Sequence, residues 1–217
     1  METETARRPL KTRQAAWANR LALLLVKARV SPNGISVVSV FFAALAGASL
    51  YFSAKVTGVE RALLLVLAVA GIQGRLVCNL LDGMVAIEGG RRTKSGEIFN
   101  DLPDRVADGL IFVCAGYAAR TQHFGVELGF LGAALAIFTA YVRMLGGASG
   151  LKQSFGGPMA KQHRMAALTI ACVLSIFETR FLRAGTVFWL ALIIVNIGCL
   201  ITIWRRTARI AQELEAR

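Results

Sequence analysis

The sequence predicts an all-α membrane protein, a single domain of six transmembrane helices preceded by an amphipathic helix at the membrane surface. Three observations predict this fold class. The chain of 217 residues is 55% hydrophobic. Several apolar runs reach the roughly 20 residues that a helix needs to cross a hydrocarbon layer of ~30 Å. No long polar segment remains that could form a separate soluble domain.

The elements are expected in the following order. A helix over residues 11–29 has one apolar side, with Trp17, Leu21, Leu24 and Leu25, and a basic remainder, which is typical of a helix lying in the membrane interface. A turn at Ser31-Pro32 then leads into the membrane. The six spans are expected at residues 35–53, 61–86, 103–119, 124–145, 165–181 and 184–204, and residues 205–217 form a polar tail.

The distribution of basic residues predicts the orientation. With six spans both termini lie on the same side, and that side carries 18 lysines and arginines against five on the other. The positive-inside rule places both termini in the cytoplasm, with the protein in the cell (inner) membrane. Anionic lipid headgroups account for the formal net charge of +12, so no nucleic-acid partner is needed.

Ionisable and amide side chains gather at the cytoplasmic ends of the second and third spans. One face of the second span carries Arg75, Asn79, Asp82 and Ala86, and the third span carries Asn100, Asp101, Asp104 and Asp108. Ionisable residues inside a membrane are costly and mark function by default. Such a set of hard oxygen ligands suits Mg²⁺ or Mn²⁺. The alternative is that the acids pair with Arg75 and Arg105 and only hold the bundle together.

The stretch from Asn79 to Asp104 resembles the signature of the CDP-alcohol phosphotransferase family, D-x2-D-G-x2-A-R-x8-G-x3-D-x3-D, with the same spacing throughout. Five of its eight defined positions are identical, namely Asp82, Gly83, Ala86, Gly96 and Asp104. Three differ, because Asn79 and Asn100 replace Asp and Ile87 replaces Arg. Ser31-Pro32-Asn33 also resembles the family's entry to its first helix.

The resemblance implies a reaction of phospholipid biosynthesis. A CDP-linked lipid, usually CDP-diacylglycerol, is attacked by an alcohol and CMP leaves. Two Mg²⁺ or Mn²⁺ ions held by the signature carboxylates are implied, and the general base for the alcohol maps to Asp104. Gly83, Ala86 and Gly96 leave room for the nucleotide, and a homodimer is expected from the family. The acceptor alcohol leaves no mark in the sequence.

The departures from the signature change what the site can hold. An asparagine offers an oxygen to a metal but no negative charge. We therefore expect Asp82 and Asp104, with Asp101 or Asp108, to bind metal, and the two asparagines at positions 79 and 100 to act as neutral ligands. A phosphate clamp lost at position 87 could be replaced from the following loop, by Arg91, Arg92 or Lys94.

Proline 103 bears on this geometry, since a proline is best placed in the first turn of a helix. If the third span begins at Pro103, Asn100 and Asp101 lie on a loop.

Three polar residues outside the carboxylate cluster are candidate substrate contacts. Asn33 belongs to the entry motif. Arg143, near the cytoplasmic end of the fourth span, could contact a phosphate or reach the interface. Lys161 lies in a basic, glycine-rich stretch, residues 156–164, which could form a phosphate pocket or only supply positive-inside charge. Glycines in and after the fourth span, such as Gly129, favour close helix packing.

Three other functions fit parts of the pattern. Residues 100–108 match NDxxDxxxD, an aspartate motif of membrane prenyltransferases, but a second such motif is absent and residues 79–86 stay unexplained. A non-catalytic relative that binds a CDP-lipid or metal would explain the three signature changes. A transporter would need acids along a path across the membrane, whereas here they gather at one face and no inverted repeat is evident.

Overall fold

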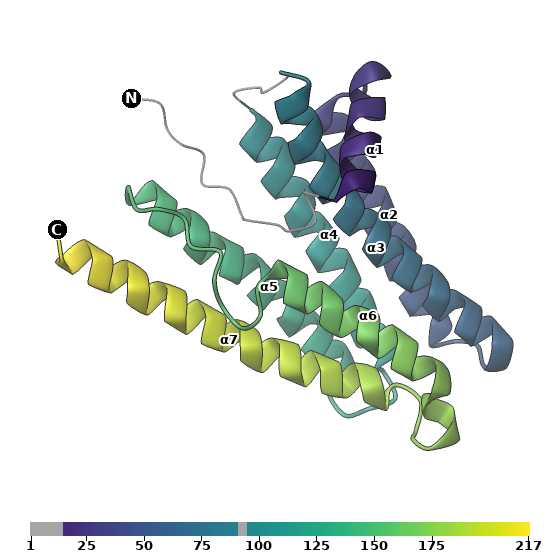
Figure 1. Cartoon of the computed structure of the whole chain (residues 1–217). Helices are drawn as coiled ribbons and strands as arrows, with labels where there is room; N and C mark the ends of the chain where they lie inside the picture. Colours follow the sequence, from purple (N-terminus) through teal and green to yellow (C-terminus); the bar gives the residue numbers. More distant parts are fainter. Residues whose placement is uncertain (1–14, 91–94) are drawn as a thin grey trace.

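The structure is a computed structural model that describes residues 15–90 and 95–217, and over these ranges the chain is helical with no strand (Figure 1). This confirms the all-α fold class. The elements are α1 Ala16–Lys27, α2 Pro32–Ser53, α3 Gly58–Glu88, α4 Gly96–Ala118, α5 Gly125–Ala148, α6 Lys161–Phe177, the 3₁₀ turn η2 Glu178–Arg180 and α7 Thr186–Glu215.

Helices α2 to α7 pack around one apolar core. Helix α2 packs against α3 and α4, α4 against α5, α5 against α7, α7 against α6, and α6 against α3, so the contacts form a closed ring (Figure 1). Buried side chains from all six helices form this core, including Leu50, Leu65, Phe112, Ala136, Leu168 and Leu192.

Four helices, α2, α3, α5 and α7, are long and apolar enough to cross a membrane. Their outward faces carry large apolar side chains, for example Phe41, Leu63 and Ile194, which are 68%, 64% and 60% exposed. Exposed apolar surface on this scale marks a surface that contacts something other than water, here lipid. The chain is therefore a membrane protein.

Helix α1 packs beside α3 (Figure 1). Its residues Ala18 and Ala22 are fully buried, in a small cluster with Leu81 and Val85 of α3. The predicted apolar side is divided, because Leu21 and Leu25 pack on this cluster whereas Trp17 and Leu24 are exposed. The helix begins at Ala16, and residues 11–14 of the expected range lie outside the described residues.

Two predicted boundaries are wrong. Helix α4 begins at Gly96 and contains Pro103, so Asn100 and Asp101 are helical. The proline removes one backbone hydrogen bond in the N-terminal part of the helix, and the contacts of α4 with other helices offset this loss. Helix α7 continues to Glu215 through most of the expected tail, with an ion pair of 2.6 Å between Arg209 and Glu213 one turn apart.

Glycines allow α4 and α5 to cross closely, as expected for Gly129. A Cβ atom on Gly129 would lie 2.6 Å from the Cα of Gly116 and 2.7 Å from the carbonyl oxygen of Phe112. Small residues at such crossings supply the packing that holds helices together in lipid. This packing is within one chain.

Substitution of Gly129 by Ala is expected to destabilise the protein by about 1–3 kcal/mol, because the added methyl group meets backbone atoms that cannot move aside easily. Thermal unfolding in detergent measures the effect. The matched control is Gly109→Ala in α4, since a Cβ there meets nothing within 4 Å. An equal melting temperature for both variants would contradict the assigned crossing.

Where α6 leads into α7, Glu178 joins three segments. Its buried carboxylate accepts hydrogen bonds from Arg61 of α3, from Ser175, and from the backbone N–H groups of Gly185 and Val187 at 2.6 and 3.0 Å. The last two belong to the N-terminus of α7, where a negative charge is favourable.

Substitution of Glu178 by Gln is expected to lower the free energy of unfolding by about 3 kcal/mol, because Arg61 is left buried without a counter-charge. The measurement is again thermal unfolding in detergent. Glu127→Gln is the control, since Glu127 is exposed at the start of α5. A loss no greater than that of the control would contradict this role.

Candidate functional site

The predicted site residues of α3 and α4 meet across the helix interface. The side-chain amide of Asn79 donates to Asp104 Oδ1 at 3.0 Å. Arg75, one turn earlier on α3, donates to the same oxygen at 3.4 Å and forms an ion pair of 2.7 Å with Asp108. The spacing of four along each helix therefore brings these side chains together.

A third helix contributes a cation to Asp104. Lys161 is the first residue of α6, and its Nζ lies 2.5 Å from Asp104 Oδ2. The Asp104 side chain is 8% exposed and the Lys161 side chain 19% exposed, so little of the pair is in contact with solvent. Arg105 approaches the same oxygen at 3.9 Å. Asp104 is thus surrounded by positive charge.

Asp82 has a different environment. Its Oδ2 accepts a hydrogen bond of 2.7 Å from the hydroxyl of Ser36 in α2, and its Oδ1 accepts one of 2.6 Å from the backbone N–H of Gly83. It is 5% exposed, and it forms no ion pair among the described residues. A buried carboxylate without a counter-charge is costly and favours the binding of a cation. The sequence offered only one signal for Ser36, a hydroxyl inside an apolar span.

Asp108 joins four helices. It is fully buried and lies between Arg75 of α3 and Arg164 of α6, at 2.7 and 2.9 Å. Arg164 also donates to Thr139 Oγ1 of α5 and to the carbonyl oxygen of Met159, at 2.9 and 3.1 Å. Sequence reasoning placed Arg164 only in the basic stretch 156–164 and gave Thr139 no role, because residues that pair across four helices share no local pattern.

Asp101 joins α4 to α5. Its carboxylate pairs with Arg143 at 2.6 Å and with Arg105 at 3.6 Å. The guanidinium of Arg143 also lies over the ring of Phe155, 5.1 Å from its centroid. Asp101 and Asp108 each have cationic partners already, and their place among the metal ligands stays a prediction.

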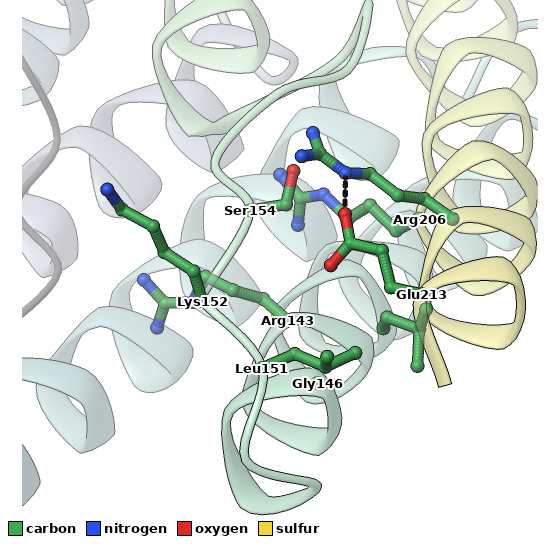
Figure 2. A pocket seen from close by; sticks show the side chains of 9 residues that line it. Arg143, Gly146, Leu151, Lys152, Ser154, Arg206 and Glu213 are labelled. Carbon is green, nitrogen blue, oxygen red and sulfur yellow. Dashed lines mark hydrogen bonds and ion pairs between the residues drawn. The ribbon is translucent and has the colours of Figure 1, made fainter. Parts of the chain in front are cut away.

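Arg143 also lines a small basic cleft between the ends of α5 and α7 (Figure 2). Three more cations line this cleft, Lys152, Arg206 and Arg209, and its one acid, Glu213, is paired with Arg209. Neither Asp82 nor Asp104 contributes to its lining. An excess of positive charge in a cleft favours anions.

The remaining predicted site residues lie near the carboxylates but are less enclosed. Asn100 is exposed on α4, one turn before Asp104, and Gly96 opens that helix. Gly83 and Ala86 are half-buried on α3. Asn33 lies in the first turn of α2, where Ser31 Oγ accepts a hydrogen bond of 3.1 Å from the Gly34 N–H. The expected clamp residues Arg91, Arg92 and Lys94 lie outside the described residues.

The donor set fits one divalent ion. Asp82 is buried without a counter-charge, and Asp104 with the amide oxygens of Asn79 and Asn100 could complete a hard oxygen set around an ion. A second ion has no comparable support among the described residues. No group of three or more carboxylate, imidazole or thiolate side chains suited to a metal occurs among the described residues, and Asp104 is already paired with Lys161.

The sequence was compared with known protein families and with known proteins. No family model matches the sequence. An uncharacterized protein from Aquifex aeolicus is 26% identical over 193 residues, which cover 88% of this chain and 87% of that protein.

Crystal structures of phosphatidylinositol phosphate synthase from Mycobacterium tuberculosis superpose on the chain. The complex with manganese and citrate gives a TM-score of 0.72 at 17% identity, covering 89% of this chain and 88% of that one. The structure with CDP-DAG bound gives 0.73 at 18%, covering 90% and 94%, and the apo form 0.70 at 17%, covering 87% and 93%. The chain has the fold of this phosphatidylinositol phosphate synthase.

Proposed function

We propose that the protein is a CDP-alcohol phosphatidyltransferase, which transfers the phosphatidyl group of a CDP-linked lipid such as CDP-diacylglycerol to an alcohol and releases CMP. The observation that carries the proposal is the contact of Asn79 with Asp104 between α3 and α4, with Asp82 buried one turn after Asn79, in the register of the family signature. The fold is that of a synthase whose structure has been determined with CDP-DAG bound.

The chemistry assigns roles to the residues of the site. The alcohol oxygen attacks the phosphorus that carries the diacylglycerol, the bond from that phosphorus to the oxygen of CMP breaks, and CMP leaves with the electron pair. Asp104 accepts the proton of the alcohol, as a positioned carboxylate can. Gly83, Ala86 and Gly96 leave space beside the two helices for the nucleotide, and Asn33 and Arg143 are the remaining candidate contacts.

A divalent ion, Mg²⁺ or Mn²⁺, is proposed as the cofactor, with Asp82 and Asp104 as its charged ligands and the two asparagines as neutral ones. Such an ion would neutralise charge on the pyrophosphate. The manganese-bound synthase supports this assignment by its fold. Asp82 supports it too, because it is buried, hydrogen-bonded to Ser36 and without an ion pair among the described residues.

The same proposal extends to the membrane arrangement. We infer that α4 and α6 cross the membrane together with α2, α3, α5 and α7, because both complete the ring of packed helices. Helix α4 is too polar to be recognised as a span by composition. Two of its charged residues, Asp104 and Asp108, are paired with Arg75 inside the bundle. By the distribution of basic residues both termini lie in the cytoplasm, with α1 in the interface of the cell membrane. A homodimer is expected, and light scattering in detergent tests it.

The test is CMP release by purified protein with CDP-diacylglycerol, Mn²⁺ and a panel of alcohols that includes glycerol phosphate, inositol phosphate and serine. Turnover with one alcohol that stops on chelation supports the proposal and identifies the product. No turnover with any alcohol in protein that melts cooperatively would contradict it.

The ion pairs favour one second candidate, a non-catalytic relative that binds the CDP-lipid without turnover. A catalytic base held by Lys161, Arg75 and Asn79 is the specific observation behind it. Binding of CDP-diacylglycerol without CMP release would identify this candidate. The segment from Asn79 to Ala86, which takes part in the site, disfavours a prenyltransferase.

A further inference from the structure

We infer that the ammonium group of Lys161 takes the place of one of two divalent ions in this site, so that the chain binds one ion where the full signature binds two. The inference rests on the proposed function for its comparison with the signature, but its test requires no turnover. It gives Lys161 a role as a fixed cation for the substrate's phosphates.

Geometry places Lys161 where a cation is needed. Its Nζ lies 2.5 Å from Asp104 Oδ2, while the other oxygen of Asp104 accepts from Asn79 and Arg75. An ion bound to Asp104 Oδ2 would therefore have to displace the ammonium group. Two positive charges a few ångströms apart in a partly buried site repel each other strongly.

The asparagines point to the same conclusion. The Nδ2 group of Asn79 donates to Asp104, so Oδ1 is the atom of this amide that remains as a neutral ligand for an ion. Relative to the signature, the two changes at positions 79 and 100 remove two negative charges. Exchange of one doubly charged ion for a singly charged ammonium group offsets one of these two charges. Lys161, a partly buried cation with one carboxylate partner at 2.5 Å, supplies that group.

The ammonium group is also placed to contact a ligand. It has three N–H donors, and one of them forms the hydrogen bond to Asp104. The side chain is 19% exposed, and Asp104 is the one acceptor that its ammonium group contacts among the described residues. Oxygens of a phosphate are the acceptors that a lysine of this kind binds as a point charge.

The experiment counts bound Mn²⁺ per purified chain in detergent, by electron paramagnetic resonance of free Mn²⁺ during titration. We expect one ion per chain for the unaltered protein. The triple variant Asn79→Asp, Asn100→Asp, Lys161→Met restores the signature carboxylates and removes the ammonium, and it is expected to bind two. Lys152→Met, an exposed lysine of the loop after α5, is the matched control and should leave the number at one.

If the triple variant does not fold, Lys161→Met alone decides the question. It is expected to bind the single ion at least about tenfold more tightly, because a competing charge next to Asp104 is gone. Two ions per chain in the unaltered protein, or no change in number and affinity in either variant, would overturn the inference. No substrate is added in this experiment. The number of bound ions is therefore measured in the same way whether or not the protein releases CMP.

Discussion

CMP release is expected to fall by at least about a thousandfold when Asp82 and Asp104 are both changed to Asn, because the site then loses its base and its charged metal ligands together. The substitution keeps side-chain size and removes only charge. In the described structure Asp104 contacts the cationic groups of Lys161 and Arg75, and Asp82 accepts a hydrogen bond from Ser36. The measurement is initial rate of CMP release at saturating CDP-diacylglycerol and acceptor.

The two single variants separate the roles. Asp104→Asn should lower the rate while Mn²⁺ binding at Asp82 persists, whereas Asp82→Asn should lose both. Glu127→Gln is the control for a carboxylate-to-amide change, because Glu127 is exposed at the start of α5, at the other end of that helix from Arg143. Activity of the double variant within tenfold of the unaltered protein would exclude these aspartates from the chemistry.

The sequence was sufficient to predict the contacts that follow from helix period. Asn79 and Asp82 lie on one face of a helix, and Asp104 lies on the next helix, so a short connection brings them together. Apolar runs likewise predicted the positions of α2, α3, α5 and α7. Each of these predictions uses information within about two helical turns or between consecutive helices.

Contacts between distant segments could not be predicted in this way. Ser36, Lys161 and Arg164 reach Asp82, Asp104 and Asp108 across sequence separations of 46, 57 and 56 residues. Lysine and arginine at the start of a span are equally well explained by the positive-inside rule, so their sequence positions gave no reason to assign either to a carboxylate. Tertiary packing alone selects the partner.

Helix boundaries depended on a similar competition. Pro103 indicated a helix start, since proline suits a first turn, yet α4 begins at Gly96. Before the proline Asp101 pairs with Arg143, and after it Asp104 pairs with Lys161. These tertiary contacts favour the helical form of the segment, although the proline removes one backbone hydrogen bond. Local propensity yields here to interactions that the local sequence does not contain.

Substitution of Arg75 by Met is expected to cost about 3–5 kcal/mol of stability, because it leaves the buried carboxylates of Asp104 and Asp108 with one cation fewer. The Arg75 and Asp108 side chains are both 0% exposed and lie 2.7 Å apart. Water cannot reach the carboxylate of Asp108 at that depth to solvate it. Thermal unfolding in detergent, monitored by circular dichroism, measures the loss.

A double-mutant cycle shows whether this cost arises from Asp108. If it does, Asp108→Asn in the Arg75→Met background should recover part of the lost stability, because the uncompensated charge is removed as well. Strictly additive losses would contradict the pairing. Asp108→Asn alone should lower the melting temperature without changing the number of bound Mn²⁺ ions, since Arg75 and Arg164 already neutralise Asp108. A loss of metal would instead place Asp108 among the ligands, because only a ligating carboxylate couples its charge to the ion directly.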